Sequence, residues 1–215
     1  MKLKAEIEIN WNRFIKELFY LASPFLEARQ DLSHTRIAHE YALLLMQKEG
    51  GNKLIVEPAI ILHDVGWSML EPDDIGQAYG VRAKGERAKQ LNRVHELEGA
   101  SIARKLLQDM DYDISLIDQI TLIIEQHDSG KQIHSIEEGL VKDSDKLWRF
   151  SRVGFKEEIE RQDLDPKSRY RYLTDHYQTW FFTKTGRSLA EKELKERAME
   201  EATNAPLKKI PFDSA

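Results

Sequence analysis

Apolar residues in this 215-residue chain recur with the period of an α-helix, and runs that alternate as in a half-buried β-strand are scarce. Such a pattern is typical of helices that bury one face against one another. Apolar residues make up 41% of the sequence and charged residues 32%, the balance of an ordinary folded protein. The sequence therefore predicts an all-α fold, whose length fits one domain better than two.

Capping residues, prolines and glycines divide the pattern into helices. We expect one helical domain over 1–215, with a C-terminal helical extension at about 156–203 and a flexible tail at 204–215. The expected segments are a helix over about 5–22 that ends before Ser23–Pro24, a helix from Asp31–Ser33 to Gly50–Gly51, a short apolar helix with Pro58 in its first turn and Gly66 at its end, a long polar excursion over 67–92, helices through 100–107 and 114–124, a connection over 131–135, a helix over 136–160, an aromatic helix after the turn at Asp165–Pro166, and a polar helix over 188–202.

Composition excludes several classes of protein. No apolar run approaches the roughly 18 residues of a membrane span, and the N-terminal sequence MKLKAEIEINWNRF has acidic residues where a signal peptide is apolar. We therefore expect a cytoplasmic protein without a membrane partner. The absence of cysteine rules out disulfides, thiolate zinc sites and cysteine nucleophiles. With a net charge of −5 and no long basic run, nucleic acid is not an expected partner.

Four histidines fall on faces that the apolar pattern predicts to be buried. Each alone has an ordinary explanation, a neutral imidazole hydrogen-bonded to a backbone carbonyl. Four together all need polar partners, and one shared metal centre would supply them. They are His34, on the face of Ala38, Tyr41, Ala42 and Leu45; His63, after a run with no polar face; His95, in line with Gly99, Ile102 and Leu106; and His127, which continues the stripe of Ile117, Ile120 and Ile124.

Two carboxylates occupy similarly apolar positions. Asp64 directly follows His63 at the end of a short apolar helix, and Asp145 lies between Val141 and Trp148 on one helical face. Burying an ionised carboxylate is costly unless a cation compensates it, and the carbonyl end of a helix also favours positive charge. Mixed imidazole and carboxylate ligands suit iron, manganese, cobalt, nickel or zinc better than calcium or magnesium.

These residues stand in segments that resemble the HD-domain phosphohydrolases, whose signature is H…HD…D on a helical core. The resemblance covers about residues 25–155 and implies an HD-domain bundle in which a bound metal activates water against a phosphate ester or anhydride. It implies a catalytic role for Asp64, and it favours Asp145 over Asp143, which lies about 200° away around the helix. The matching segments are DLSHTRIAHEYALLL with His34, AIILHDVGW with His63 and Asp64, and VKDSDKLWRF with Asp145.

Two further segments resemble a more specific branch, written H…HD…H…H…D. They are VHELEGASIARKLL with His95 and IIEQHDSG with His127. In that branch six residues hold two metals, commonly iron, and the Asp of the HD pair bridges them. The long insert at 67–92 departs from the branch. The resemblance implies one or two divalent transition metals, of which iron is expected first and manganese, nickel, cobalt or zinc are alternatives; the first would be held by His34, His63, Asp64 and Asp145, and the second by Asp64, His95 and His127.

Basic residues near these segments are candidates to contact a substrate phosphate. Lys146 and Arg149 flank Asp145, and Arg82 and Lys84 belong to a locally basic stretch of the insert. A solvated charged surface is the ordinary alternative for each of them. Weaker candidates of the same kind are Arg87, Lys89, Arg93 and Lys131.

The remaining histidines have other expected places. His39 is about 140° around its helix from His34 and should lie at the surface, pointing away from the metal. His134 falls in the connection before residue 136. His176 belongs to an aromatic stripe with Tyr172, Tyr177 and Trp180, which we expect to pack in the core or, if exposed, to contact a partner such as the second copy of a homodimer.

The leading functional hypothesis is a metal-dependent phosphohydrolase acting on a nucleotide or another small phosphate compound. A di-iron oxygenase is one alternative, because HD-type sites also activate dioxygen. A helical sensing or scaffold module with a structural metal is another, although nothing requires such a module to keep six ligand-type residues.

Overall fold

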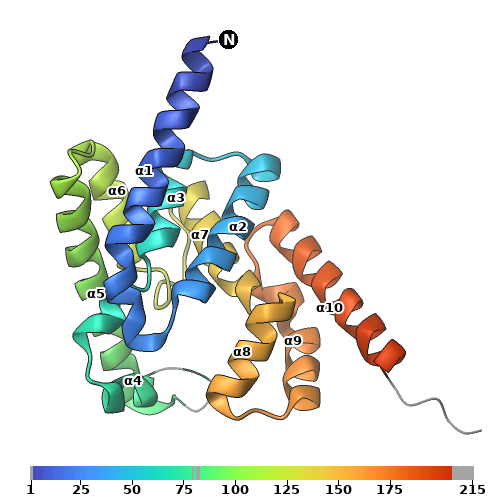
Figure 1. The fold of residues 1–215 in the computed structure, drawn as a ribbon. Helices are drawn as coiled ribbons and strands as arrows, with labels where there is room; N and C mark the ends of the chain where they lie inside the picture. Colours follow the sequence, from blue (N-terminus) through green and yellow to red (C-terminus); the bar gives the residue numbers. More distant parts are fainter. Residues whose placement is uncertain (1, 79, 81–82, 205–215) are drawn as a thin grey trace, which may run out of the picture.

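The computed structural model describes residues 2–78, 80 and 83–204, which form α-helices and two short 3₁₀ helices and contain no β-strand. The all-α prediction is confirmed, and Figure 1 shows the helices arranged as a bundle. Their bounds are α1 Lys2–Leu26, η1 Glu27–Arg29, α2 Leu32–Glu49, α3 Lys53–Leu62, η2 Val65–Met69, α4 Pro72–Ala78, α5 Gly85–Asp109, α6 Ile114–Ile124, α7 Ile136–Trp148, α8 Arg152–Gln162, α9 Pro166–Trp180 and α10 Lys184–Asn204.

The centre of the bundle is α3, which packs against α1, α2, α5, α6 and α7 (Figure 1). Every residue from Ile55 to Leu62 is buried, as a helix without a polar face requires. Its one ionisable residue in this stretch, Glu57, accepts hydrogen bonds from the Trp11 indole and the His39 imidazole, both at 2.8 Å. The carboxyl end of α3 therefore lies in the interior.

Two prolines lie inside helices, where the sequence predicted a helix end and a first turn. Pro24 is inside α1, and Pro58 is the sixth residue of α3. Proline has no N–H, so in each case the carbonyl four residues earlier loses its helical partner. The Ser23 hydroxyl donates to the Tyr20 carbonyl at 2.8 Å, and the Tyr112 hydroxyl donates to the Leu54 carbonyl at 2.7 Å. These side chains replace the missing bonds.

The polar excursion predicted over 67–92 is mostly helical, so this prediction is wrong. It contains the end of η2, all of α4 and the first turns of α5. Gly80, in the short connection, and Gly85, the first residue of α5, have positive φ angles, whereas Gly76 is an ordinary residue of α4. Glycine therefore marked the break correctly at two of the three positions.

The single helix predicted over 136–160 is divided into α7 and α8. The Ser151 hydroxyl caps α8 by accepting from the Gly154 N–H at 2.9 Å. A Cβ atom on Gly154 would lie 2.0 Å from the Trp148 carbonyl oxygen, so the bend requires glycine there. The bend directs the chain from the bundle toward the C-terminal helices.

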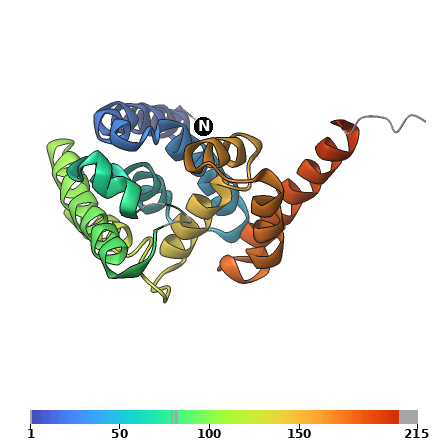
Figure 2. The same ribbon diagram turned by 90° about the horizontal axis from the view of Figure 1, so that it is seen from below.

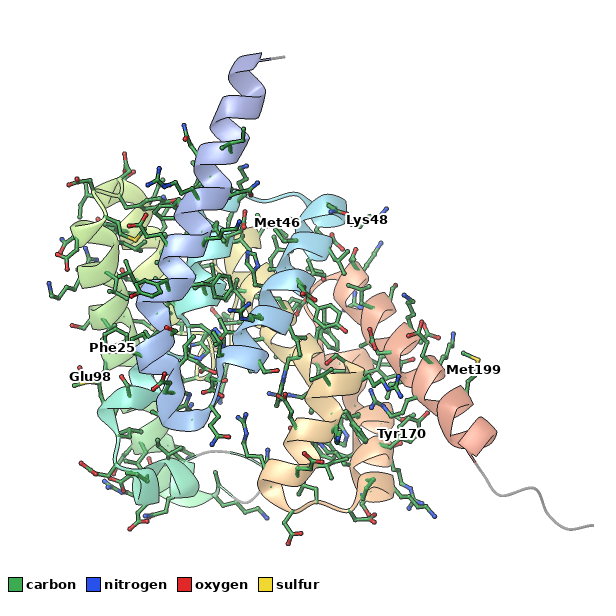
Figure 3. All side chains as sticks on the ribbon, in the orientation of Figure 1. Phe25, Met46, Lys48, Glu98, Tyr170 and Met199 are labelled. Carbon is green, nitrogen blue, oxygen red and sulfur yellow. The ribbon has the colours of Figure 1, made fainter. Side chains whose placement is uncertain are left out.

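The last three helices lie along one side of the bundle (Figures 1 and 2). As expected, α9 begins after Asp165, whose carboxylate caps it. Arg169 of α9 forms a buried ion pair with Glu158 of α8, with two contacts of 2.7 Å. The far end of α10 projects away, and Met199, which is 60% exposed, stands out from it (Figure 3).

The division into one domain with an extension stays a prediction, and the tail predicted from residue 204 lies, apart from Asn204, outside the described residues. None of the described helices is long and apolar enough to cross a bilayer.

Candidate metal centre

Four ligand-type side chains converge at the end of α3. The Nε2 atoms of His34 and His63 lie 2.9 Å apart. Asp64 Oδ2 is 3.3 Å from each of these nitrogens, and Asp145 Oδ1 lies 3.3 Å from His34 and 3.6 Å from His63. Donors bound at 2.0–2.2 Å in a tetrahedron are about 3.3–3.6 Å apart, and neighbouring donors in an octahedron about 3 Å apart. This group, the first cluster, has the spacing of a metal coordination shell.

The tautomer of His63 supports this assignment. Its Nδ1 lies 2.7 Å from the Ile60 carbonyl, which can only accept, so Nδ1 carries the proton. In the neutral ring, Nε2 then has no hydrogen and carries a lone pair. This nitrogen faces the Nε2 of His34 and two carboxylate oxygens. Such a group of acceptors is stable only around a proton or a cation. A divalent metal fits this donor set.

A second cluster begins at the other oxygen of Asp64. Asp64 Oδ1 lies 3.8 Å from His95 Nε2 and 3.6 Å from His127 Nε2, and the two nitrogens are 3.3 Å apart. The His127 Nδ1 donates to the Ile124 carbonyl at 2.8 Å, which again leaves Nε2 free to bind a metal. The carboxylate of Asp64 therefore faces both clusters, one oxygen to each.

Two glycines bring His95 next to Asp64. A Cβ on Gly66 of η2 would lie 1.9 Å from the His95 carbonyl oxygen and 2.5 Å from the Gly99 nitrogen of α5. Any side chain at Gly66 would therefore force η2 and α5 apart. Trp67, one residue on, stacks on the His95 ring at 3.9 Å between centroids and donates its indole N–H to Asp64 Oδ1 at 2.9 Å.

Charges in the first cluster balance one another. Burial alone would lower the pKa of His63, but the carboxylates of Asp64 and Asp145 outweigh it and hold that pKa well above its ordinary value. Burial alone would raise the pKa of Asp64, but Arg29 and His63 hold it well below the usual range. Both effects keep the carboxylate ionised and ready to bind a cation.

The histidines of the second cluster differ from each other. Burial and the neighbouring His127 lower the pKa of His95 to about 3. Burial opposes a charge on His127 as well, yet the Asp64 and Asp128 carboxylates raise its pKa to about 9. Without a metal, His127 rather than His95 is therefore the ring that takes up a second proton, on Nε2, at neutral pH.

A cavity of about 290 Å³ opens over both clusters. Asp64, His34 and His127 line its floor. The C-terminal extension and the region of the insert supply its walls. The wall residues include Ala78, Gly80 and Asn92 on one side and Arg149, Glu158, Gln162, Arg169, Tyr172 and Trp180 on the other.

The six residues predicted as metal ligands thus lie together, whereas Asp143 does not join them. Its carboxylate accepts from the Phe182 N–H at 2.9 Å, the Thr183 N–H at 2.8 Å and the Thr183 hydroxyl at 2.7 Å. Asp143 therefore holds the turn before α10. Of this pair, only Asp145 faces the histidines.

Of the four residues predicted to contact a substrate phosphate, two do not line this cavity. The Lys146 ammonium donates to the Trp180 carbonyl at 2.9 Å and lies over the Phe182 ring, outside the cavity. Lys84 is exposed and does not line the cavity, and Arg82 lies outside the described residues. Arg149 does line it.

The weaker candidates are bound elsewhere or exposed. Arg87 pairs with an aspartate of α4, Lys89 with Glu86 and Arg93 with Glu96, while Lys131 is exposed and outside this cavity.

The other histidines have separate environments. His39 does point away from the metal, but its side chain is only 13% exposed and pairs with Glu57, so the surface prediction is wrong. His134 is exposed in the connection before α7. His176 is half-buried and stacks on Tyr172, which is itself 42% exposed and lines the cavity with Trp180. The aromatic stripe is therefore not only core packing.

Sequence reasoning missed two residues of the site. Arg29, in η1, donates to Asp64 Oδ2 and to Asp31 Oδ2, both at 2.7 Å. Nothing in the pattern marks it, because a short 3₁₀ helix has no periodicity to read. Asp128 lies beside His95 and His127. Its signal was available, since His127–Asp128 repeats the dipeptide of His63–Asp64.

Comparison with known proteins agrees with this geometry. A family model described as HD domain matches residues 31–149. No curated protein matches the chain. One similar solved structure is a predicted HD superfamily hydrolase from an uncultured Thermotogales bacterium, with 20% identity over 87% of this chain and 88% of that one and a TM-score of 0.57. Another is an HD-superfamily hydrolase from Bacillus thuringiensis, with 22% identity over 91% of this chain and 99% of that one and a TM-score of 0.56.

At these identities the two structures show a shared fold. The family match covers more than half of the chain and includes all six convergent residues. The chain therefore belongs to the HD domain family, with a buried histidine–aspartate cluster that fits a divalent metal.

Proposed function

We propose that this protein is a metal-dependent phosphohydrolase that cleaves a phosphate ester or anhydride of a nucleotide or another small phosphate compound. The observation that carries the proposal is the position of Asp64, whose two oxygens face two clusters of metal-ligand type at the floor of one cavity. A carboxylate in that position can hold two cations a few ångströms apart, the arrangement used for in-line displacement at phosphorus. Iron is our first expectation for the metal, ahead of manganese, nickel, cobalt and zinc.

A bound divalent metal would supply Lewis acidity toward a phosphoryl oxygen and lower the pKa of a coordinated water. His34, His63, Asp64 and Asp145 would hold one ion, and Asp64, His95 and His127 another. Asp64 fixes the spacing between the clusters, because its oxygens are held by the Arg29 and Trp67 hydrogen bonds at 2.7 and 2.9 Å.

Arginines at the cavity suit an anionic substrate. Arg29 and Arg149 both line it, and the Arg149 guanidinium lies over the Trp180 ring with 5.9 Å to the centroid. Arg149 follows Asp145 by one helical turn, so its side chain stands beside the first cluster. Charge accumulating on phosphoryl oxygens would meet these cations in a partly dry site, where their stabilising effect is large.

The test combines metal analysis with a search for substrate. Protein purified without chelators is analysed for metals, and phosphate release is then measured over nucleotides, dinucleotides and simple phosphate esters. We expect bound transition metal and release that a chelator abolishes and metal restores. Metal-loaded protein that releases phosphate from none of these compounds would contradict the proposal.

Two other functions give different results in the same assay. A di-iron oxygenase would consume oxygen and release no phosphate. A sensing or scaffold module would hold metal without turnover of either kind. The open cavity with arginines in its walls favours the phosphohydrolase over both.

A further inference from the structure

The dipeptide His127–Asp128 repeats the local structure of His63–Asp64. Each follows a helix with an apolar end, and each histidine donates from Nδ1 to the carbonyl three residues earlier, at 2.7 Å for His63 and 2.8 Å for His127. The chain therefore presents two aspartates in equivalent positions, each directly after a histidine whose Nε2 points into the site. Asp64 already serves both clusters, which raises the question of what Asp128 does.

Asp128 completes a ring of donors around the second cluster. Its Oδ2 lies 3.9 Å from His95 Nε2 and 4.0 Å from His127 Nε2. These distances are slightly longer than those of Asp64 Oδ1, which lies 3.8 and 3.6 Å from the same two nitrogens. With the 3.3 Å separation of the nitrogens, they approach the edges of about 3.3–3.6 Å expected for a tetrahedral site with bonds of 2.0–2.2 Å. A contraction of a few tenths of an ångström onto a cation would close the site.

The backbone of Asp128 is held by a buried carboxylate. Glu96, which directly follows His95 and is fully buried, accepts from the Asp128 N–H at 3.0 Å, the Ser129 N–H at 2.8 Å and the Ser129 hydroxyl at 2.6 Å. Arg93 donates at 3.1 Å to Glu96 Oε2, the oxygen that also accepts from the Ser129 hydroxyl. The neighbours of His95 and His127 along the chain are thereby linked, so the two histidines and Asp128 are positioned as a unit.

A second buried charge fixes the end of the same turn. The Lys142 ammonium, from α7, donates to the Gly130 carbonyl at 2.8 Å and pairs with Glu138 at 2.8 Å. A Cβ on Gly130 would lie 2.6 Å from the Gln126 carbonyl oxygen, so the turn is also tightly closed. A segment held by two buried ionic groups is suited to carrying a ligand, whereas a surface aspartate needs no such support.

We propose that Asp128 is a fourth protein ligand of the second metal, which would then be held by His95, His127, Asp64 and Asp128. The proposal deepens the proposed function and rests on its two-metal site. The Asp128 side chain is 42% exposed and lines the cavity, so it binds from the open side while Asp64 binds from the buried side. Glu96 is a positioning residue for this ligand.

The experiment measures metal content and affinity, which do not depend on finding a substrate. Wild type, Asp128→Asn and the control Asp175→Asn, an exposed aspartate of α9, are loaded with a small excess of Co²⁺ and examined by elemental analysis and visible absorption. We expect two ions in the wild type and the control. In Asp128→Asn we expect about one tightly bound ion, a second-site affinity at least about tenfold lower, and a changed absorption band.

A second variant separates positioning from folding. Glu96→Gln keeps the size of the side chain but weakens its hydrogen bonds to Asp128 and Ser129. It should lower the affinity for the second ion while leaving the first in place. Circular dichroism checks that each variant is folded. Two ions bound with wild-type affinity in Asp128→Asn, or only one ion in the wild type, would overturn the proposal. A failed phosphate-release screen with these metal results intact would count against the proposed function alone.

Discussion

The two clusters of ligand-type side chains share Asp64 but are built differently. The first takes its donors from α2, α7 and the end of α3, and donor distances of 2.9–3.6 Å are set by buried, closely packed helices. The second takes His95 from α5 and His127 from a turn after α6, and its distances, with those to the proposed ligand Asp128, range from 3.3 to 4.0 Å. Helices fix donors more rigidly than turns do. We therefore expect the first cluster to bind its ion tightly and the second cluster to bind its ion more weakly.

Replacing the shared residue should have the largest effect. Asp64→Ala removes a donor from both clusters, so we expect loss of both ions while circular dichroism stays close to the wild type. A metal provides several kcal/mol of transition-state stabilisation, and about 1.4 kcal/mol is tenfold in rate, so phosphate release should fall roughly a thousandfold or more. Asp175→Ala is the matched control. Retained metal and turnover in Asp64→Ala would show that the two clusters do not depend on this residue.

Replacing a residue that belongs to one cluster alone should distinguish the metal affinities of the two clusters. His127→Ala leaves all four donors of the first cluster, whereas His34→Ala removes one of them. We expect each variant to keep about one ion, and the ion kept by His127→Ala to be bound at least about tenfold more tightly, since it remains in the rigid cluster. Elemental analysis and competition with a chelator measure both. Equal loss of both ions in the two variants would mean that the clusters form one cooperative site.

The metal affinity of the second cluster should depend on pH. At neutral pH His127, with its pKa raised to about 9, is protonated in the metal-free protein, and an ion must displace that proton. The affinity of the second cluster should therefore rise about tenfold per pH unit as the pH rises toward 9, and fall as the pH is lowered. Titration calorimetry in buffers of different ionisation enthalpy detects the released proton. Binding to the second cluster without proton release would contradict this protonation state.

A smaller change should affect only one oxygen of Asp64. Trp67→Phe removes the indole N–H that Oδ1 accepts and keeps an aromatic ring on His95. We expect the affinity of the second cluster to fall about tenfold, the low end for a residue that supports a ligand. The first cluster should be unchanged, because Oδ2 is held by Arg29. An equal loss in both clusters would show that Asp64 moves as a whole.

The histidines of the site were predictable because each lies on an apolar stripe, and a stripe reports which side of a helix faces the core. The direction of a long side chain is not encoded in this way. Lys146 flanks Asp145 but turns outward to the Trp180 carbonyl. His39 lies off the stripe of His34, yet it is covered because Glu57 of another helix pairs with it. Contacts between distant segments decided both cases.

The same limit explains the helix boundaries that were wrong. Helix α3 tolerates Pro58 in its interior because Tyr112, more than fifty residues away, donates a hydrogen bond to the Leu54 carbonyl that the proline leaves unpaired. The side chains of Asn52 and Ser151 cap α3 and α8, although neither of these helix starts was predicted from the sequence. A local cap is therefore recognised in the structure more readily than in the sequence, where many serines and asparagines compete for the role.

Arg29 bears on the order in which the protein is assembled. Its guanidinium already occupies one oxygen of Asp64, stacks on Trp67 with 4.6 Å to the ring centroid, and is itself held by the buried Asp31. The chain thus carries an internal counter-ion for the most buried carboxylate of its site. Small domains that rely on a metal for this purpose are unfolded until the metal arrives. We therefore expect this protein to fold without its ions and to acquire them afterwards, through the open side of the cavity.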